Sequence, residues 1–295
     1  MSNLRTRRAA GVGACATLAI LAVGAPAQAR PPIPDPQPSL PTVNMGRLLV
    51  AAQLDDYRPG NNKTGGAVKS VKRVQRALRK KGYRRVVVDG NFGSTTARAY
   101  SRWQKRAVNA SGIGANGLPG ETSLKKLGKG RFRVVRVVRP GKRTTYGGSP
   151  VNLRTKRMMK AAARRVGGKG CNLDLTKGSY LPPDGSSAAT HAGGGAVDIN
   201  SNVRCGKSIK RVRKALRAVG FAAWYRGPNS GFAPHFHAIA ISDPDMSTPI
   251  SHSGQFTAMH QIVGFARKQD GLSSPAFNQP MTRRLRTWEA YRRSH

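Results

Sequence analysis

Apolar residues in the first half of the chain recur at helical spacing between Val68 and Leu127. Val71, Val74 and Leu78 stand at i, i+3 and i+7 with lysines and arginines between them, which predicts a helix ending at Gly82. An apolar run then enters a glycine-rich turn, after which Ser94 or Thr95 is expected to cap a second helix. We expect that helix to bury Thr96, Tyr100, Trp103 and Ala107, and a short third helix to cover residues 121–127.

The second half of the chain mixes helical and alternating patterns. Helices are predicted over residues 153–166 and 209–219, and strands over 132–138, 197–199 and 234–241. The strand at 132–138 is interpreted as an opening element of the second domain. The expected fold class is therefore α+β, with a small three-helix bundle followed by an α+β domain that has an antiparallel sheet.

The N-terminus has the layout of an export signal. Arginines at positions 5, 7 and 8 precede an apolar stretch, and Ala27-Gln28-Ala29 gives an A-x-A cleavage pattern. Residues 1–29 are interpreted as a signal peptide rather than a membrane anchor, because the apolar stretch is shorter than the roughly 20 residues a span requires. The protein is expected to be secreted and associated with the cell wall, without a membrane span.

Charge adds a constraint on partners. The 295 residues include 52 Lys and Arg against 12 Asp and Glu, a formal charge of +40. Such a charge acts at long range and suits a polyanion. Export and an aromatic content of 6% argue against nucleic acid as the physiological partner, since single-strand binding uses stacking aromatics. We therefore expect binding to anionic wall polymers. A secreted cationic protein acting on DNA or membranes is the weaker alternative.

Two cysteines, Cys171 and Cys205, remain after removal of the predicted signal peptide. In an exported chain they are expected to form a disulfide, with free or metal-bound thiols as the alternative. Closing a loop of 34 residues would stabilise the fold by about 3–4 kcal/mol in the chain-entropy model.

Residues 67–128 resemble a known wall-binding module. The segments VQRALRKKGY, VDGNFGSTTARAYSRWQ and GLPGETSLKKL are similar to the three-helix peptidoglycan-binding domain found at the ends of many wall hydrolases. The resemblance implies binding to wall glycan or peptide. Phe92 and Trp103 are expected to fill a small core rather than contact the ligand.

Candidate chemistry lies between Ser186 and Ile241. His191 and Asp198 stand seven residues apart with three glycines between them, and His235 and His237 occupy alternate positions of a predicted strand. Alternate residues of a strand face the same way, so both histidines are expected in one site. Histidine and aspartate side chains suit Zn²⁺, and three protein ligands leave an open position for catalysis.

The spacing H-x6-D followed by H-x-H resembles the zinc D-Ala-D-Ala carboxypeptidase and endopeptidase family of peptidoglycan peptidases (M15-type), most strongly in THAGGGAVDI and PHFHAIAI. The resemblance implies that His191, Asp198 and His237 bind zinc and that His235 is the catalytic base or orients the nucleophile. It also implies hydrolysis of a stem-peptide amide bond, by either a carboxypeptidase or an endopeptidase. A disulfide between the two cysteines would stiffen this site.

One departure from the family concerns a substrate-binding arginine. Relatives often carry it in a Gly-Tyr-Arg-like turn, whereas this chain has Gly178-Ser179-Tyr180-Leu181. Lys177 or Arg226 is expected to substitute, and Arg226 is taken as the substrate-binding residue. The departure keeps a second hypothesis open: a non-catalytic wall-binding protein with a degenerate peptidase-like domain.

The expected organisation has five parts. They are a signal peptide (1–29), a Pro-rich spacer and polar linker with a short helix at 45–54 (30–66), the peptidoglycan-binding domain (67–128), the zinc peptidase domain (129–247) and a basic C-terminal tail (248–295). In the tail, His252 and His260 are expected to be ordinary polar residues. Residues 281–293 are predicted as an amphipathic helix that either binds an anionic polymer or packs on the domain.

Overall fold

A computed structural model describes residues 39–58, 63–184, 188–203, 205–273, 275–276 and 279–295. The predicted signal peptide and most of the Pro-rich spacer lie outside these residues. Residues 40–295 form one compact unit that mixes helices and sheets, as the α+β prediction requires. No helix in the described part of the chain is long and apolar enough to cross a membrane.

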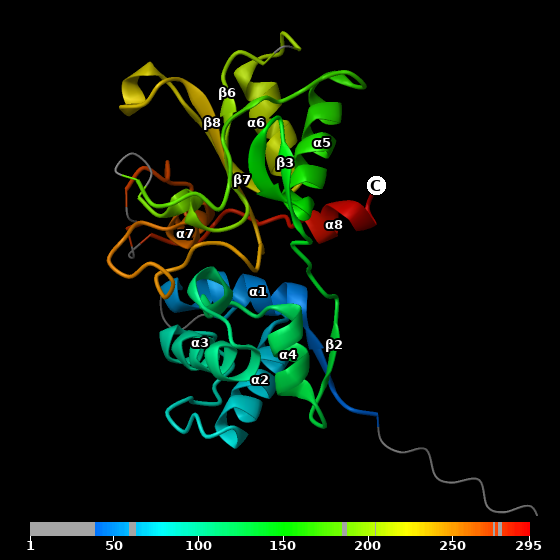
Figure 1. The fold of residues 1–295 in the computed structure, drawn as a ribbon, viewed down its shortest axis with the longest axis vertical. Helices are drawn as coiled ribbons and strands as arrows, with labels where there is room; N and C mark the ends of the chain where they lie inside the picture. The colour runs from blue at the N-terminus through cyan, green and yellow to red at the C-terminus, as the bar shows by residue number, and fades with distance from the viewer. Residues whose placement is uncertain (1–38, 59–62, 185–187, 204, 274, 277–278) are drawn as a thin grey trace, which may run out of the picture. The chain divides into compact units, whose positions relative to one another are not determined.

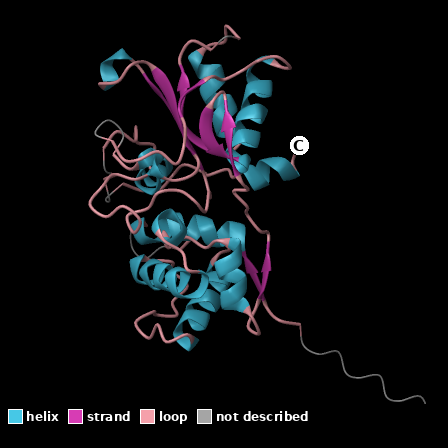
Figure 2. Cartoon of the chain, in the orientation of Figure 1, coloured by secondary structure: helices cyan, strands magenta, loops and turns pink. Residues whose placement is uncertain are grey.

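The first part of this unit is helical (Figures 1 and 2). The three predicted helices are α2 (Val68–Lys80), α3 (Ser94–Val108) and α4 (Glu121–Gly128). A further helix, α1 (Met45–Leu54), packs against α2 and buries Leu48, Leu49 and Leu54. The segment assigned to a linker therefore contributes to the core of the bundle. Short 3-10 turns follow α1 at Asp55–Tyr57 and precede α4 at Gly112–Ala115.

The expected side-chain cap of α3 is wrong. Gly93 occupies the N-cap position, and neither Ser94 nor Thr95 caps the helix through its side chain. The exposed first turn is held from outside the helix, because the backbone N–H of Ser94 donates to Asp56 Oδ1 (2.7 Å). Phe92 and Trp103 are buried as predicted, at 0% and 8% exposure.

The predicted strand at 132–138 is shorter than expected and pairs elsewhere. β2 (Arg133–Val135) runs parallel to β1 (Thr42–Asn44), which directly precedes α1. The strand ends where Arg136 adopts a positive φ of 52°. This segment therefore closes the helical part and is not an opening strand of the second sheet.

The second part begins with a hairpin of β3 (Arg143–Tyr146) and β4 (Ser149–Asn152), followed by α5 (Leu153–Gly167). The main sheet has the order β5-β6-β8-β7 and is antiparallel throughout. Its strands are β5 (Leu175–Lys177), β6 (Ala196–Asn200), β7 (Phe221–Arg226) and β8 (His235–Ala240), and α6 (Ile209–Ala218) lies between β6 and β7 in the chain.

The two faces of this sheet are buried in different ways. Val197, Ile199, Phe236 and Ala238 pack into one cluster with apolar residues of α5 and α6. The alternate positions face the other way, where Ala196 and Ile239 join a cluster that includes residues of α7 (Ala258–Ala266). Since strand residues alternate between faces, the polar residues Asp198 and His237 belong to the α7 side of the sheet.

The region predicted as a basic tail contains packed structure. Ile262 and Val263 of α7 are fully buried. The predicted helix over 281–293 is shortened to α8 (Trp288–Arg293), whose N-cap is Thr287. Glu289 of α8 forms a salt bridge with the buried Arg154 of α5 (2.8 Å), which attaches the C-terminus to the α+β part.

Hydrogen bonds connect the helical part to the segment that follows β8. The buried Asn116 donates through Nδ2 to the carbonyl oxygens of Pro244 (2.8 Å) and Met246 (3.0 Å), and its own carbonyl accepts from Thr248 Oγ1 (2.7 Å). Gln53 of α1 accepts from the backbone of Ser242 (3.2 Å). Buried polar contacts therefore join the helical part to the α+β part, in addition to the apolar contacts between them.

Candidate metal centre

Strand pairing brings the predicted ligands together. Asp198 on β6 lies directly opposite His237 on β8, and Trp224 on β7 lies opposite His237 on the other side. His235 precedes His237 by two positions, so the two histidines share a face, and both line the same cavity. The structure thus brings His235, His237 and Asp198 together in one cavity.

His191 reaches the site from a short 3-10 turn, η4 (Thr190–Ala192), which precedes β6. Its Nδ1 lies 2.7 Å from the carbonyl oxygen of Gly178, an arrangement in which Nδ1–H donates. Nε2 then carries the free lone pair, and it lies 3.3 Å from Asp198 Oδ2. A backbone carbonyl that fixes the tautomer and ring orientation is the usual partner of a metal-binding histidine.

The three glycines after His191 have a steric explanation. A Cβ at Gly193 would lie 2.4 Å from the backbone nitrogen of Ser247, and one at Gly194 would lie 2.7 Å from Tyr180 Oη. Gly195 adopts a positive φ of 87°, which disfavours other residues. The glycines let the chain pass closely under residues 245–247 and turn into β6, so that His191 and Asp198 meet.

His191, Asp198 and His237 form a group whose ligand atoms all lie within 4.8 Å of one another. Nδ1 of His237 is 2.6 Å from Asp198 Oδ1. Nε2 of His191 and Nε2 of His237 are buried with no hydrogen-bond partner. Buried polar atoms without partners are rare and call for an explanation, which a bound cation would supply here. The residues present therefore fit a metal ion; the chemistry of the donors suits Zn²⁺ without identifying it.

The electrostatics of the group favour its ligand forms. Burial lowers the pKa of His237, against the opposing charge of Asp198, so the ring stays neutral at neutral pH. Burial alone would raise the pKa of Asp198, but His237 and His191 outweigh it and hold that pKa well below its usual range. Neutral imidazoles and an ionised carboxylate are the forms that bind divalent metals.

His235 lies beside the group rather than within it. Its Nε2 is 3.7 Å from Asp198 Oδ1, and its Nδ1 is 2.7 Å from the carbonyl oxygen of Ala233. With Nδ1–H donating to that carbonyl, Nε2 is the basic nitrogen. The ring is more accessible than that of His237, with side-chain exposures of 16% and 7%. An accessible basic nitrogen next to a metal group suits proton transfer.

The cavity around the group has a volume of about 370 Å³ and also receives the two cations expected to replace the family arginine. Lys177 pairs with Asp184 (2.5 Å). Arg226 is 5% exposed, and its Nη1 donates to the carbonyl oxygen of Asp270 (2.6 Å). Among the described residues, no salt bridge joins Arg226 directly to a carboxylate. Burial lowers its pKa, and the charges of Asp270 and Asp198 offset only part of that effect. A nearly buried guanidinium that has no direct carboxylate partner favours an anionic ligand.

Sequence reasoning missed two residues of the site: Trp224, which contacts His237, and Gln261, which lines the cavity. Trp224 stacks on His237 with ring centroids 6.0 Å apart, and its position opposite His237 could have been inferred only from the strand register. Gln261 of α7 donates to Thr190 Oγ1 (3.0 Å), and its Oε1 is buried without a partner. Gln261 lies 71 residues beyond Thr190 in the sequence, and no local pattern signalled that contact.

The remaining histidines of the C-terminal region lie outside the group. His260 takes part in the N-terminal cap of α7 with Thr257 and stacks on Phe256. His252 contacts Ser251 Oγ (3.0 Å). These positions agree with the expectation that both are ordinary polar residues.

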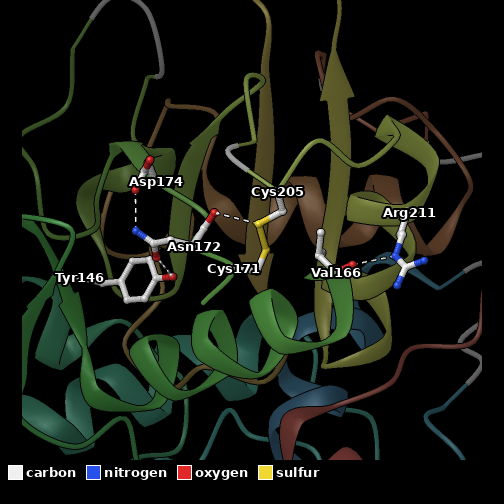
Figure 3. The surroundings of a disulfide bond; sticks show 7 residues. All are labelled: Tyr146, Val166, Cys171, Asn172, Asp174, Cys205 and Arg211. Atoms are coloured by element: carbon white, nitrogen blue, oxygen red, sulfur yellow. Dashed lines mark hydrogen bonds between the residues drawn. A yellow bond between two sulfur atoms is a disulfide. The ribbon is translucent and has the colours of Figure 1, made fainter. Parts of the chain in front are cut away.

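The predicted disulfide is present between Cys171 and Cys205, with Cα atoms 5.5 Å apart (Figure 3). Cys205 Sγ approaches the carbonyl oxygen of Asn172, whose side chain bonds to Tyr146 and Asp174 (Figure 3). The covalent loop encloses β5, η4 and β6, and so both His191 and Asp198. A cross-link around two prospective ligands restricts the unfolded states of the segment that carries them.

Comparison with known proteins bears on the helical part. Residues 68–127, which span α2 to α4, match the family described as a peptidoglycan binding domain. The chain contains a peptidoglycan-binding domain. That domain supports binding to the cell wall, and together with the disulfide it is consistent with an extracellular or wall location. The family match ends before the main sheet, and no curated protein and no solved structure matches the chain.

Proposed function

We propose that this protein is a secreted zinc peptidase that binds peptidoglycan and hydrolyses an amide bond of its stem peptide. The observation that carries the proposal is the buried His191–Asp198–His237 group, with His235 beside it in the same cavity. The peptidoglycan-binding domain supports the choice of substrate, because it would hold the chain on the polymer that contains these peptides.

In this proposal His191, Asp198 and His237 hold the metal. Zinc, when bound, polarises a scissile carbonyl and lowers the pKa of water toward neutrality. The protein contributes a rigid donor set: Gly178 orients His191, and strand pairing fixes Asp198 against His237. A preorganised set of this kind costs little rearrangement when substrate arrives.

His235 is assigned to proton transfer. Its Nδ1 is engaged by the carbonyl of Ala233, which leaves Nε2 to accept a proton from the attacking water. The same nitrogen can return that proton to the leaving amine, so one residue completes the hydrolysis. Its distance of 3.7 Å from Asp198 Oδ1 keeps it near the metal group without making it a ligand.

Arg226 is assigned to substrate binding. Its guanidinium lines the cavity, is nearly buried, and donates only through Nη1 among the hydrogen bonds of the described residues. Stem peptides carry carboxylates, and arginine binds a carboxylate through a planar fork. Removal of a terminal D-alanine and cleavage inside the stem both remain compatible with such a contact, so the proposal includes a carboxypeptidase and an endopeptidase.

The test is mass spectrometry of defined muropeptides after incubation with the zinc-loaded protein. We expect the loss of one alanine for a carboxypeptidase, or a cut within the stem for an endopeptidase. His191→Ala and chelation should abolish either product, and Arg226→Gln should raise KM more than it lowers kcat. His252→Ala is the matched control, because it removes a histidine that lies outside the group.

His235→Ala separates catalysis from metal binding. We expect turnover to fall about 10²–10⁴-fold while one zinc per chain remains bound, measured by elemental mass spectrometry. Intact muropeptides from a wild-type protein that binds zinc and sediments with purified wall would overturn the peptidase assignment. They would leave the alternative of a wall-binding protein with an inactive site.

A further inference from the structure

The helical part carries far more positive charge than its acidic residues can balance. Between residues 40 and 132 there are 20 lysines and arginines and four acids. Each of these acids already accepts hydrogen bonds or forms ion pairs within the protein. Asp55 is buried and accepts from Thr64 and Phe92, and Asp56 accepts from the start of α3.

The other two acids are also engaged. Asp89 accepts from Gln75 Nε2 (2.8 Å) and from the backbone of Asn91. Glu121 pairs with Lys125 and Arg139, whose hydrogen bonds outweigh partial burial and lower its pKa to about 2. The basic surface of α2 and α3 therefore has little acidic compensation within the described chain, and its cations are available to an external anion.

Part of this charge gathers around a groove. The groove has a volume of about 560 Å³ and is bounded by the loop after α2 and by one face of α3. Four arginines line it together with Tyr83: Arg84, Arg85, Arg98 and Arg102. All four are exposed, and none forms an ion pair with a carboxylate of the described residues.

The line of cations continues beyond the groove along α3, and we call Arg84, Arg85, Arg98, Arg102 and Arg106 together the arginine track. Tyr83 lies close enough to Arg102 and Arg106 for both charges to lower its pKa against the larger effect of burial. One turn beyond Arg102, Arg106 lines a second hollow of about 350 Å³ with Lys81 and Lys126. From Arg98 to Arg106 the helix rises about 12 Å, so the cations are spaced along a line rather than around a point.

We propose that this arginine track is a binding site for a phosphodiester-linked wall polymer of the polyol-phosphate type. Every charged residue that lines the groove is an arginine, and a guanidinium presents a planar donor fork that matches phosphate oxygens. A linear set of cations suits a chain of repeating anions better than a single ion. Two aromatic residues line these hollows, Tyr83 in the groove and Trp103 in the second hollow, and Trp103 is only 8% exposed. They offer little surface on which successive nucleic acid bases could stack.

The site is separate from the metal centre and does not depend on peptidase activity. Its residues belong to the peptidoglycan-binding domain, so it would give that domain a second wall ligand. Peptidoglycan and the phosphate polymer would then be held by one module, which lengthens residence at the wall.

The experiment compares two triple variants of equal charge. Arg84→Gln, Arg98→Gln and Arg102→Gln neutralise the track. Arg157→Gln, Lys160→Gln and Arg164→Gln neutralise three exposed cations at i, i+3 and i+7 on α5, outside the track. Binding of the full mature chain to immobilised poly(glycerol phosphate) is measured across a salt series, and thermal unfolding checks that both variants are folded.

We expect the track variant to lose about 30-fold or more in affinity and to reduce the slope of log Kd against log salt by about two to three. The α5 variant should change affinity by less than about threefold. Sedimentation of the track variant with wall stripped of phosphate polymers should be unchanged. Equal losses in both variants would overturn the proposal in favour of general charge attraction, as would tighter binding to DNA than to the polyol phosphate at matched salt.

Discussion

Among single residues, Asp245 has an unusual environment next to the glycine-rich segment of the candidate metal centre. Its carboxylate accepts from Tyr180 Oη (2.8 Å), and its backbone carbonyl accepts from the N–H of Gly194 (2.8 Å). Burial, reinforced by the charge of Asp243, raises the pKa of Asp245 to about 6. The folded protein therefore binds a proton at this site over a pH range in which the unfolded chain has released it.

This pKa predicts a pH-dependent effect of Asp245→Asn. A carboxyl whose folded pKa is raised contributes stability at low pH and loses that contribution as pH rises through the folded value. Between pH 4 and pH 7 the wild type should therefore lose about 2–3 kcal/mol relative to the variant, which does not titrate. Urea unfolding of both proteins at the two pH values measures the difference.

The control for Asp245→Asn is Asp174→Asn, which removes one negative charge from a carboxylate bonded to the exposed side chain of Asn172. A constant difference in unfolding free energy between wild type and Asp245→Asn across this pH range would contradict the assignment. Asparagine can still accept from Tyr180, so the comparison isolates the proton rather than the hydrogen bond.

At the scale of elements, the segment from His191 to Asp198 depends on close backbone approach. A Cβ at Gly193 would meet the backbone of Asp245 and Ser247 at 2.5 Å and 2.4 Å, and these backbone atoms have no rotamer with which to move aside. We predict that Gly193→Ala destabilises the fold by about 1–3 kcal/mol, the usual cost of overpacking, and weakens zinc binding at least about tenfold.

Calorimetric titration with zinc and denaturant unfolding measure the two effects of Gly193→Ala. Gly65→Ala is the matched control, since a Cβ there meets nothing within 4 Å and should leave both quantities within error. Normal zinc affinity in Gly193→Ala would show that the glycine-rich segment does not position His191.

The elements also show what sequence alone could predict. Helical spacing identified α2, α3, α5 and α6, because each buries one regular face. The H-x6-D and H-x-H spacings pointed to His191, Asp198 and His237, which the structure brings together as a group that could hold a metal ion, because β6 and β8 pair directly and alternate residues share a face. For these features, the spacing of residues within a short stretch of sequence was sufficient for the prediction.

Other features depended on contacts between distant segments. β2 pairs with β1, about 90 residues earlier, and no local pattern distinguishes that partner from the second sheet. The sequence did not predict α7 at residues 258–266. Nearly every residue of α7 is buried, and a helix that is buried all round has no polar face to mark its period. Because α7 was not predicted, the contribution of Gln261 to the cavity could not be predicted either.

For the whole molecule, the position of Asn116 bears on how the two parts unfold. Asn116 joins the helical part to residues 244–248 through three buried hydrogen bonds. Gly193 and Gly194 pack against the same segment, so a single stretch of chain contacts both the bundle and the support of His191. Apolar residues of α1, α2 and the main sheet also fall within one continuous cluster. The helical domain is thus built into the fold that carries the metal group, rather than held only by a linker.

This arrangement predicts one cooperative thermal transition for residues 40–295. Asn116→Ala leaves the carbonyl oxygens of Pro244 and Met246 without their donor, which should cost about 1–3 kcal/mol and lower the midpoint of the whole transition. Differential scanning calorimetry, with zinc removed so that ligand binding does not add to stability, measures this shift. Asn202→Ala, at an exposed asparagine, is the control and should leave the midpoint unchanged.

Two resolved transitions in the wild type, or a shift confined to part of the heat absorption in Asn116→Ala, would mean that the bundle and the sheet unfold independently. The wall-binding domain would then contribute nothing to the stability of the His191–Asp198–His237 group and would only be connected to it through the chain.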